Sequence, residues 1–370
     1  MNLVKYAGVS LLAMSASMAN AGGMEATALS AGFMFEDGSY GGVSIQSQTP
    51  SLKATVGGVS ATSGSVVGSV TSTNIQVKAD AFDNLSVGVA FYRQAGIKLD
   101  YQANWSLGGA AAAAALPKVD LDVNAIVLLT KYDVNDSFSV LAGLKNGTAK
   151  DAVVKIPSSL VDAAVTGGSA LSYVLGAAYE MPEIALRAEV VYETSGEYVL
   201  DTTFTGIGAG TVKASTANYM NVYVQSGIAE DTLLFVSARQ ADWLTNQVSI
   251  KHAGTGGAYA NISDFSDTTG YRIGLGRKFG DTWSSSLSYN WEGGSGATTG
   301  SPLTLSNGNQ GVSIGAKYAL NDSSAITFGG NYTEFGDIDG TWAAGTPLGA
   351  NAKFSGNSVT TLGAQFSHSF

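Results

Sequence analysis

The sequence predicts an all-β fold, a transmembrane up-and-down antiparallel β-barrel of 14 strands. Three observations predict it: short turns recur at a nearly constant pitch, residues beside the turns alternate between apolar and polar, and charged residues are scarce. Successive turn markers are 41 to 52 residues apart, which is the spacing of a repeated long hairpin. The markers are Asp37, Asp83, Asn135, Pro182, Glu230, Asp281 and Asp322, and the chain ends at Phe370.

The composition fits a wall surrounded by lipid. Only 13% of the 370 residues are charged, 45% are hydrophobic and 47 are glycine, with a mean hydropathy of +0.14. A soluble domain is usually about a quarter charged, whereas a lipid-facing barrel has an apolar outside and an uncharged polar inside. A soluble β-sandwich is the alternative. The net charge of −10 argues against a nucleic-acid partner, and a chain without cysteine has no disulfide or thiolate metal site.

The first 21 residues have the pattern of a secretory signal peptide. Lys5 supplies a positive charge, Val9 to Met18 form a short apolar stretch, and Ala19-Asn20-Ala21 fits a cleavage site. We therefore divide the chain into a signal peptide (1–21), a short N-terminal segment (22–39) and a barrel (40–370).

Fourteen strands fit between the turn markers, an even number as in single-chain bacterial barrels. In one of them Trp283, Leu287 and Tyr289 alternate with Ser284 and Ser286, so the first set is expected to face lipid. The predicted strands are 40–48, 72–82, 85–95, 120–132, 137–149, 169–180, 184–200, 212–226, 232–246, 268–278, 282–293, 309–319, 324–335 and 357–370.

The last predicted strand also alternates and ends in Phe370. A terminal aromatic residue on such a strand is similar to the signal by which the barrel-assembly machinery recognises bacterial outer-membrane barrels. We therefore expect a multi-pass barrel of the Gram-negative cell outer membrane. Its short turns and both termini would be periplasmic, and its long loops extracellular.

Catalytic and metal-binding patterns are not evident. Of the two histidines, His252 falls in a predicted loop and His368 on the lipid-facing side of the last strand. We expect no enzyme activity, no metal and no cofactor. A cylinder of fourteen strands is too wide for side chains alone to fill, so a pore, a transporter or a plugged barrel remains.

Six segments resemble the FadL-like (OMPP1/FadL/TodX) outer-membrane transporters of long-chain fatty acids and other hydrophobic compounds. The resemblance covers nearly the whole chain after the signal peptide. It is carried by Phe35 to Tyr40, Gly96 to Tyr101, Tyr132 to Gly143, Tyr173 to Arg187, Asp231 to Trp243 and Gly274 to Trp283.

The resemblance implies a barrel closed by an N-terminal hatch, an apolar capture groove in the extracellular loops, and a lateral opening in the wall near Gly88 and Gly96. This sequence departs from the family at the hatch, because residues 22–39 leave only about 18 positions and contain no Asn-Pro-Ala. The hatch would be shortened. Its candidate residues are Met24, Leu29, Phe33 and Phe35.

Candidate ligand-binding residues fall into two groups. Apolar loop residues could hold a hydrophobic molecule or pack on one another as a lid: Trp105, Ile156, Leu160 and Val161. The resemblance implies that an inward basic residue meets the carboxylate of the ligand, and Arg suits this by its bidentate geometry. The candidates are Lys145, Arg187, Arg239, Arg272 and Lys317. Alternatively these charges pair across strands, for example Arg187 with Glu189 or Glu193.

The functional expectation is passive uptake of long-chain fatty acids or other hydrophobic compounds, with capture in apolar loops and lateral diffusion through the wall. A general diffusion porin for small polar solutes is the alternative, and a structural or adhesive barrel is a third. The expected partners are a hydrophobic small molecule and outer-membrane lipid, and the protein is expected to be a monomer.

Overall fold

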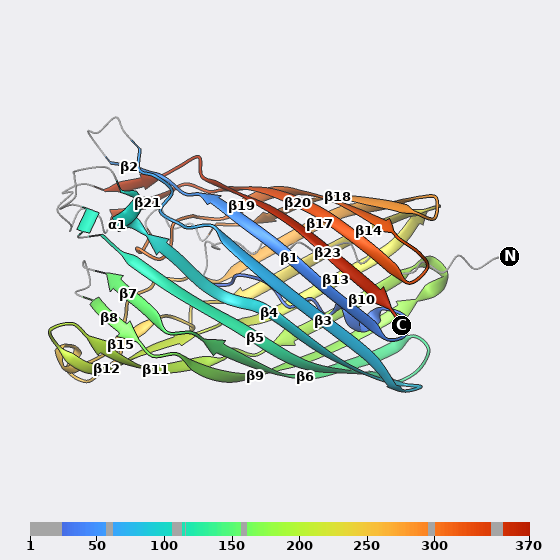
Figure 1. Ribbon diagram of the computed structural model, residues 1–370, viewed down its shortest axis with the longest axis horizontal. Helices are drawn as coiled ribbons and strands as arrows, with labels where there is room; N and C mark the ends of the chain where they lie inside the picture. Colours follow the sequence, from blue (N-terminus) through green and yellow to red (C-terminus); the bar gives the residue numbers. More distant parts are fainter. Residues whose placement is uncertain are drawn as a thin grey trace.

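Backbone hydrogen bonding closes the wall of this protein into a cylinder. The computed structural model describes residues 24–56, 62–105, 113–114, 116–156, 161–294, 300–341 and 351–370. In it, 14 strands each pair antiparallel with two neighbours (Figure 1). The predicted fold class is therefore confirmed. The predicted signal peptide lies outside the described residues.

The wall strands follow one another around the barrel in chain order. They are β1 (Tyr40–Ser51), β3 (Val70–Phe82), β4 (Leu85–Asp100), β5 (Lys118–Asp133), β6 (Phe138–Ala149), β9 (Gly168–Met181), β10 (Leu186–Glu193), β13 (Asn218–Ala229), β14 (Thr232–Asp242), β17 (Thr268–Phe279), β18 (Trp283–Glu292), β19 (Asn309–Ala319), β20 (Ser324–Phe335) and β23 (Ser358–Ser369).

The two ends of the barrel sequence form its closing seam. β1 pairs with β23 from Tyr40 opposite Ser369 to Ser51 opposite Ser358. Phe370 N donates to Ser39 O at 2.9 Å, so the ladder continues to the last residue. A closed wall leaves no strand edge unpaired at this seam, as a lipid environment requires.

The two faces of the wall have opposite chemistry. Large apolar side chains point outward and remain about half exposed, among them Leu287 at 58% and Ile314 at 65%. Small polar side chains such as Ser288, Thr327 and Asn331 point inward and are buried. A soluble protein has the opposite arrangement, with its apolar side chains inside. The apolar outer face of this wall is favourable only where lipid, an apolar solvent, surrounds it.

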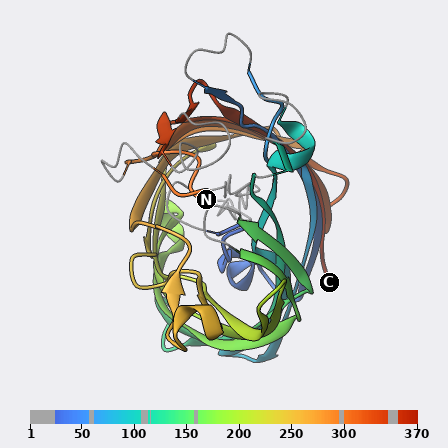
Figure 2. The ribbon, with the colours of Figure 1, turned by 90° about the vertical axis from the view of Figure 1, so that its left-hand side faces the viewer.

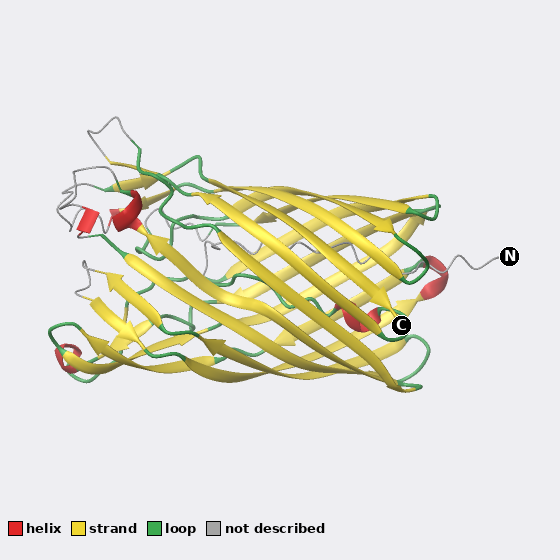
Figure 3. Ribbon diagram, viewed as in Figure 1, coloured by secondary structure: helices red, strands yellow, loops and turns green. Residues whose placement is uncertain are grey.

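One end of the barrel carries the tight turns and the other the long connections (Figure 3). We call these the turn end and the loop end. At the turn end, a 3-10 turn η3 (Pro182–Ile184) joins β9 to β10, and Phe370 lies at the same end (Figure 1).

The predicted strand 184–200 is wrong in one respect, because the wall strand β10 ends at Glu193 and a separate strand, β11 (Glu197–Phe204), begins beyond it. Between these two strands, side-chain oxygens accept the main-chain N–H groups that a neighbouring strand would otherwise bind. Asn218 Oδ1 accepts from Ser195 N and Thr216 Oγ1 from Gly196 N, both at 2.9 Å. Such side-chain bonds compete with strand pairing and end it.

Beyond this point the chain forms additional structure at the loop end. One extension of the sheet contains β7 (Ala152–Ile156), β8 (Val161–Val165), β11, β12 (Gly208–Ser215), β15 (Ser249–Lys251) and β16 (Ala260–Asn261). A small separate sheet contains β2 (Ala54–Val56), β21 (Ile338–Gly340) and β22 (Ala352–Phe354). A one-turn helix, α1 (Tyr101–Asn104), packs nearby, with Tyr101 against Phe354 at 6.3 Å between ring centroids.

The described part of the N-terminal segment, residues 24–39, lies inside the barrel, where the view along the barrel shows it enclosed by the wall (Figure 2). Its short 3-10 turn η1 (Gly32–Phe35) buries Phe33 and Met34. Within the described ranges, no helix is both long and apolar enough to cross a membrane.

The inverted faces lead to a test of stability. We expect Ile314→Arg to destabilise the barrel by about 2–4 kcal/mol in lipid, because the charge would enter the apolar band. Ser286→Arg, with its side chain toward the lumen, is the matched control and should cost much less. Equilibrium refolding into lipid vesicles measures both. Equal stability of the two variants would contradict a lipid-facing outer wall.

Candidate functional site

The ladder between β3 and β4 breaks halfway up the wall. It runs from the turn to Ile75 opposite Phe91 and ends there, although both strands continue. The chain rejoins β4 only nearer the loop end, where Gly68 N donates to Lys98 O at 2.9 Å. Between these points, which we call the β3–β4 break, β4 lacks its wall neighbour over about residues 92–97.

A bulge and a glycine accompany the break. The β4–β5 register shifts between Arg93 and Ala95, so Gln94 has no opposite residue on β5. A bulge bends its strand and increases the local twist, which turns this part of β4 away from β3. A Cβ at Gly96 would lie 2.7 Å from Leu121 O, so only glycine fits the close approach of the two strands.

The N-terminal segment occupies the free edge of β4 at the break. Ala26 N donates to Gln94 O at 3.0 Å and Gly96 N donates to Met24 O at 2.9 Å. Glu25 thereby lies opposite Ala95 in an antiparallel bridge. The segment thus satisfies main-chain groups that β3 would bond in an unbroken wall.

Closer to the turn end, η1 packs against the wall at Gly88. Phe33 and Met34 are almost fully buried there, at 3% and 0% exposure. A Cβ at Gly88 would lie 2.6 Å from Phe33 Cε2 and would also overlap Met34 Sδ. Lys78 Nζ anchors the end of the segment by donating to Glu36 O at 2.7 Å and Gly38 O at 2.9 Å.

The other candidate hatch residues are buried or partly buried elsewhere along the segment. Met24 and Leu29 are 4% and 9% exposed, and Phe35 contacts the Arg187 guanidinium at 4.7 Å from its ring centroid. The short segment is therefore folded into the lumen along its described length.

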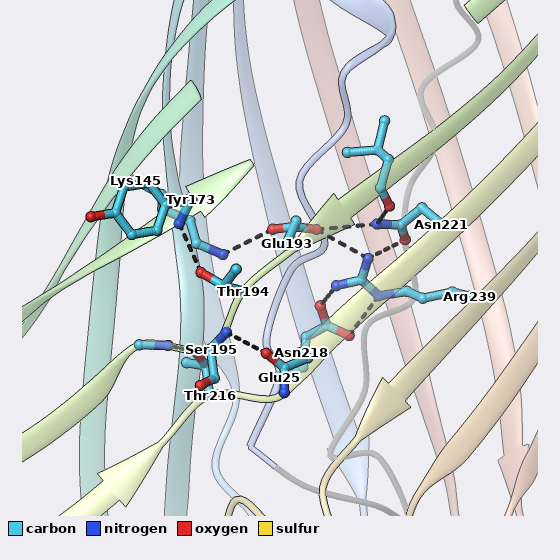
Figure 4. Close-up of polar contacts among 12 residues, drawn as sticks. Glu25, Lys145, Tyr173, Glu193, Thr194, Ser195, Thr216, Asn218, Asn221 and Arg239 are labelled. Carbon is cyan, nitrogen blue, oxygen red and sulfur yellow. Dashed lines mark hydrogen bonds and ion pairs between the residues drawn. The ribbon is translucent and has the colours of Figure 1, made fainter. Parts of the chain in front are cut away.

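A chain of buried charges links three wall strands to the N-terminal segment (Figure 4). Lys145 Nζ on β6 donates to Glu193 Oε2 on β10 at 2.9 Å, and these side chains are 0% and 1% exposed. Arg239 on β14 reaches the other oxygen of Glu193 at 3.4 Å. Glu193 therefore lies between two basic side chains and compensates for the burial of both.

Arg239 also holds Glu25 in a forked contact. Its Nε donates to Glu25 Oε2 at 3.1 Å and its Nη2 donates to Oε1. Arg239 Nη1 donates to Asn221 Oδ1, and the guanidinium lies over the Tyr219 ring at 4.0 Å. Burial raises the pKa of the Glu25 carboxyl, and the positive charge of Arg239 opposes that rise.

The other candidate bases lie apart from this cluster. Arg187 pairs with Glu189 at 3.5 Å, as the pairing alternative suggested, and not with Glu193. Arg272 on β17 lies opposite Ser237 and Asn290. Lys317 on β19 lies opposite Ser284 and Thr327. Of the five basic candidates, Lys145 and Arg239 come together through Glu193.

An apolar cavity of about 780 Å³, counting its open mouth, lies on the loop-end side of Glu25 and Ala26. Val70 of β3 and Ile97 of β4 both line it, so it reaches both sides of the break. Its other apolar walls come from several strands and connections and include Leu52, Leu99, Leu303, Leu305, Phe335 and Val359. The polar groups at its edge are few and include Arg93, whose Nε bonds Asp122 Oδ1 at 2.6 Å.

A second cavity of about 740 Å³, counting its open mouth, lies on the turn-end side of the same segment and has a mixed polar and apolar lining. Hydroxyl and amide side chains line it, together with Phe33, Phe91 and the N-terminal segment from Thr27 onward. The polar lining includes Ser30, Ser44, Gln46, Asn74, Gln76 and Gln365. The N-terminal segment therefore separates a mainly apolar space from one of mixed lining at the height of the break.

Of the apolar loop candidates, the structure describes the side chain of Trp105, which does not line either cavity. Trp105 is 4% exposed and packs against Tyr101 at the loop end, with 5.8 Å between the ring centroids. The β7–β8 hairpin brings Ile156 opposite Val161, but their side chains and Leu160 lie outside what the structure describes. The two cavities lack Lys145, Arg187, Arg239, Arg272 and Lys317 among their lining residues.

The sequence analysis missed Glu25, Asn221, Tyr219 and the bulge at Gln94. Glu25 had a usable signal, since it is the single charged residue among positions 22–35 of a segment expected to enter the lumen. The bulge at Gln94 had no such signal, because the residues around Gln94 keep the sequence pattern of a regular strand. Among the described residues, no cluster of three or more His, Asp or Glu could hold a metal ion.

A barrel of fourteen strands with a segment inside its lumen is a fold that this chain shares with proteins of known structure. Its fold is that of a Pseudomonas aeruginosa FadL homologue, with a TM-score of 0.74, 11% identity and 92% of each chain covered. The P. putida toluene transporter TodX matches with a TM-score of 0.65, 12% identity and 90% of each chain covered. The Ralstonia pickettii toluene transporter TbuX matches with a TM-score of 0.62 and 11% identity, with 95% of this chain and 97% of that chain covered.

The resemblance to FadL-like proteins drawn from the sequence is confirmed as a shared fold. No family model matches the chain, and no curated protein matches it in sequence.

The packing of η1 at Gly88 gives a test. We expect Gly88→Ala to displace η1 and to cost about 1–3 kcal/mol, since the added methyl group overlaps Phe33 and Met34. Gly270→Ala is the matched control, because its Cβ would approach no atom closer than 3.9 Å. Limited proteolysis within residues 24–39 and thermal unfolding measure the effect. Protease resistance equal to that of the parent protein would contradict the docking.

Proposed function

We propose that this protein is an outer-membrane channel for the passive uptake of hydrophobic small molecules, such as long-chain fatty acids. The observation that carries the proposal is the apolar cavity at the loop end, which reaches both edges of a break in the wall. Burial of apolar groups drives capture in such a cavity, at about 0.8 kcal/mol per CH₂. The toluene transporters with the same fold support a hydrophobic ligand.

The proposed exit is lateral, through the β3–β4 break. Beyond the N-terminal segment the second cavity carries amides and hydroxyls among its apolar residues, which makes it a poorer environment for a hydrophobic ligand than the apolar cavity. At the break the ligand would meet the N-terminal segment, which is held there by two main-chain hydrogen bonds and by the contact of Glu25 with Arg239. Movement of that segment would let the ligand pass sideways into lipid.

The orientation and partners follow from this mechanism. The turn end and both termini are proposed to be periplasmic, and the loop end extracellular. Phe370 is 83% exposed at the turn end, where the barrel-assembly machinery would recognise it. The protein is proposed to act as a monomer, which leaves the break facing outer-membrane lipid.

A charge placed in the apolar cavity tests the proposal. We expect Leu305→Arg to lower uptake of a long-chain fatty acid and of toluene by roughly tenfold, because a buried charge opposes an apolar ligand. Leu305 is 7% exposed, and the matched control is Leu244→Arg, whose side chain is 64% exposed at the loop end. Uptake is measured in cells lacking the native gene and complemented with each variant.

Two outcomes would contradict uptake of hydrophobic compounds. One is uptake by the parent protein no faster than in the deletion strain. The other is a large, steady single-channel conductance with free passage of polar solutes, which would indicate a general diffusion porin instead.

A reversible cross-link tests the lateral route. The chain has no cysteine, so Glu25→Cys with Ala95→Cys would form the sole disulfide, across a bridged antiparallel pair. We expect the oxidised double variant to lose most of its uptake, because the segment can no longer leave β4, and to regain it on reduction. The two single variants are the controls. Full uptake by the oxidised form would contradict exit through the break.

A further inference from the structure

A charged group lies on the outer face of the wall at the β3–β4 break. Arg93 follows Val89 along β4 at an even spacing, so it points to the same side as Val89, which is 43% exposed on the outside. Arg93 Nε donates to Asp122 Oδ1 on β5 at 2.6 Å, and Lys150 Nζ donates to Asp122 Oδ2 at 2.6 Å. We call Arg93, Asp122 and Lys150 the outer triad.

The outer triad carries an excess positive charge. Two basic side chains share one carboxylate, which leaves one positive charge over. The next charged residues toward the loop end on these strands are Lys98 and Asp120, which lie opposite each other and balance. The Asp151 carboxylate accepts from Gly167 N at 2.8 Å, on the β9 side of the chain and away from β5. An anion that reaches the triad is therefore attracted to it.

The basic groups of the triad have donors to spare. Within the described ranges, neither Nη atom of Arg93 has a hydrogen-bond partner, although the side chain is only 11% exposed. A Cβ at Gly96 would overlap Arg93 Nη2, so this glycine leaves the room in which the guanidinium lies. Largely buried N–H groups without an acceptor are costly. Phosphate oxygens suit them, because arginine binds phosphate with two N–H groups at once.

Apolar side chains cover the outer face on the turn-end side of the triad. In the β4–β5 ladder, Phe91 lies opposite Ile126 and Val89 lies opposite Leu128. Ile126 and Leu128 are 54% and 45% exposed on the outside. An amphiphile that lies against this part of the wall would place its head group at the triad and its acyl chains on these residues.

The opposite side of the barrel has a different outer face near the loop end. There Trp291 of β18 stacks on Tyr271 and Tyr289, with 5.2 and 5.8 Å between the ring centroids. Such aromatic side chains mark the membrane interface of barrels in general. The β4–β5 side carries two basic groups instead, which give it a preference for an anionic head group.

We propose that the outer triad binds the phosphate of an outer-leaflet lipid. Arg93 and Lys150 are the phosphate ligands, and Asp122 holds both in place. The acyl chains lie along the apolar outer face of β4 and β5, beside the break. In the outer leaflet of a Gram-negative outer membrane this lipid is lipopolysaccharide, whose lipid A part carries phosphate above its acyl chains. The inference rests on the proposed orientation, with the loop end extracellular, and not on the proposed uptake.

The test measures binding of lipid A to the purified full-length protein in a neutral detergent. We expect Lys150→Gln to weaken binding of diphosphoryl lipid A by about threefold and Arg93→Gln by roughly tenfold, because each removes a charged contact to phosphate. Arg93→Lys should lose less than Arg93→Gln, since it keeps the charge without the fork. The matched control is Lys251→Gln, an exposed lysine on β15 at the loop end.

Three outcomes would overturn the inference. The first is unchanged lipid A binding in Lys150→Gln, a variant expected to fold because its side chain is 62% exposed. The second is an equal loss in Lys251→Gln, which would reflect overall charge. The third is displacement of lipid A by inorganic phosphate at equal concentration, which would indicate a site for a free anion. Lipid A without phosphate groups should bind equally to the parent protein and all variants.

The failure of this inference is distinguishable from the failure of the proposed function. A parent protein that takes up hydrophobic compounds but does not bind diphosphoryl lipid A would overturn the lipid site alone. A parent protein that binds diphosphoryl lipid A through the triad but takes up no hydrophobic compound would overturn the proposed uptake alone.

Discussion

The need to pair every main-chain polar group in a lipid-facing wall underlies the rest of this structure. A closed antiparallel barrel meets that need with strands alone. Among the described wall residues, the ladder does not meet it where β4 leaves β3 beyond Phe91. The N-terminal segment supplies the missing partners at Gln94 and Gly96. The same short stretch of chain therefore completes the wall, divides the lumen and faces the apolar cavity.

Electrostatics reinforces this hydrogen bonding. Lys145, Glu193 and Arg239 come from strands far apart in sequence, and their burial is tolerable because each touches an opposite charge. Glu25 joins them from the N-terminal segment. Because one residue connects the charge cluster to the β4 edge, the state of the cluster and the state of the wall are coupled through direct contacts.

The sequence was sufficient for the barrel and insufficient for the site. Turn residues and period-two alternation are local signals, so strands such as 309–319 and 324–335 were predicted with the bounds that the structure shows. The β3–β4 break is a property of the pairing between two strands and not of either strand's own sequence. The contact of Glu25 with Arg239 joins residues 214 positions apart. Neither leaves a local pattern. The extra strands after Glu193 were merged with the wall for the same reason, since only the side chains of Thr216 and Asn218 end the ladder there.

The anchor at Lys78 has a mechanical consequence. Its ammonium group holds the carbonyls of Glu36 and Gly38 beside the closing seam, so one end of the N-terminal segment is a fixed pivot. The segment then acts as a lever whose far tip carries Met24 to Ala26. A small rotation at the pivot would move that tip the furthest, so the apolar cavity would open at the β3–β4 break while η1 moves little.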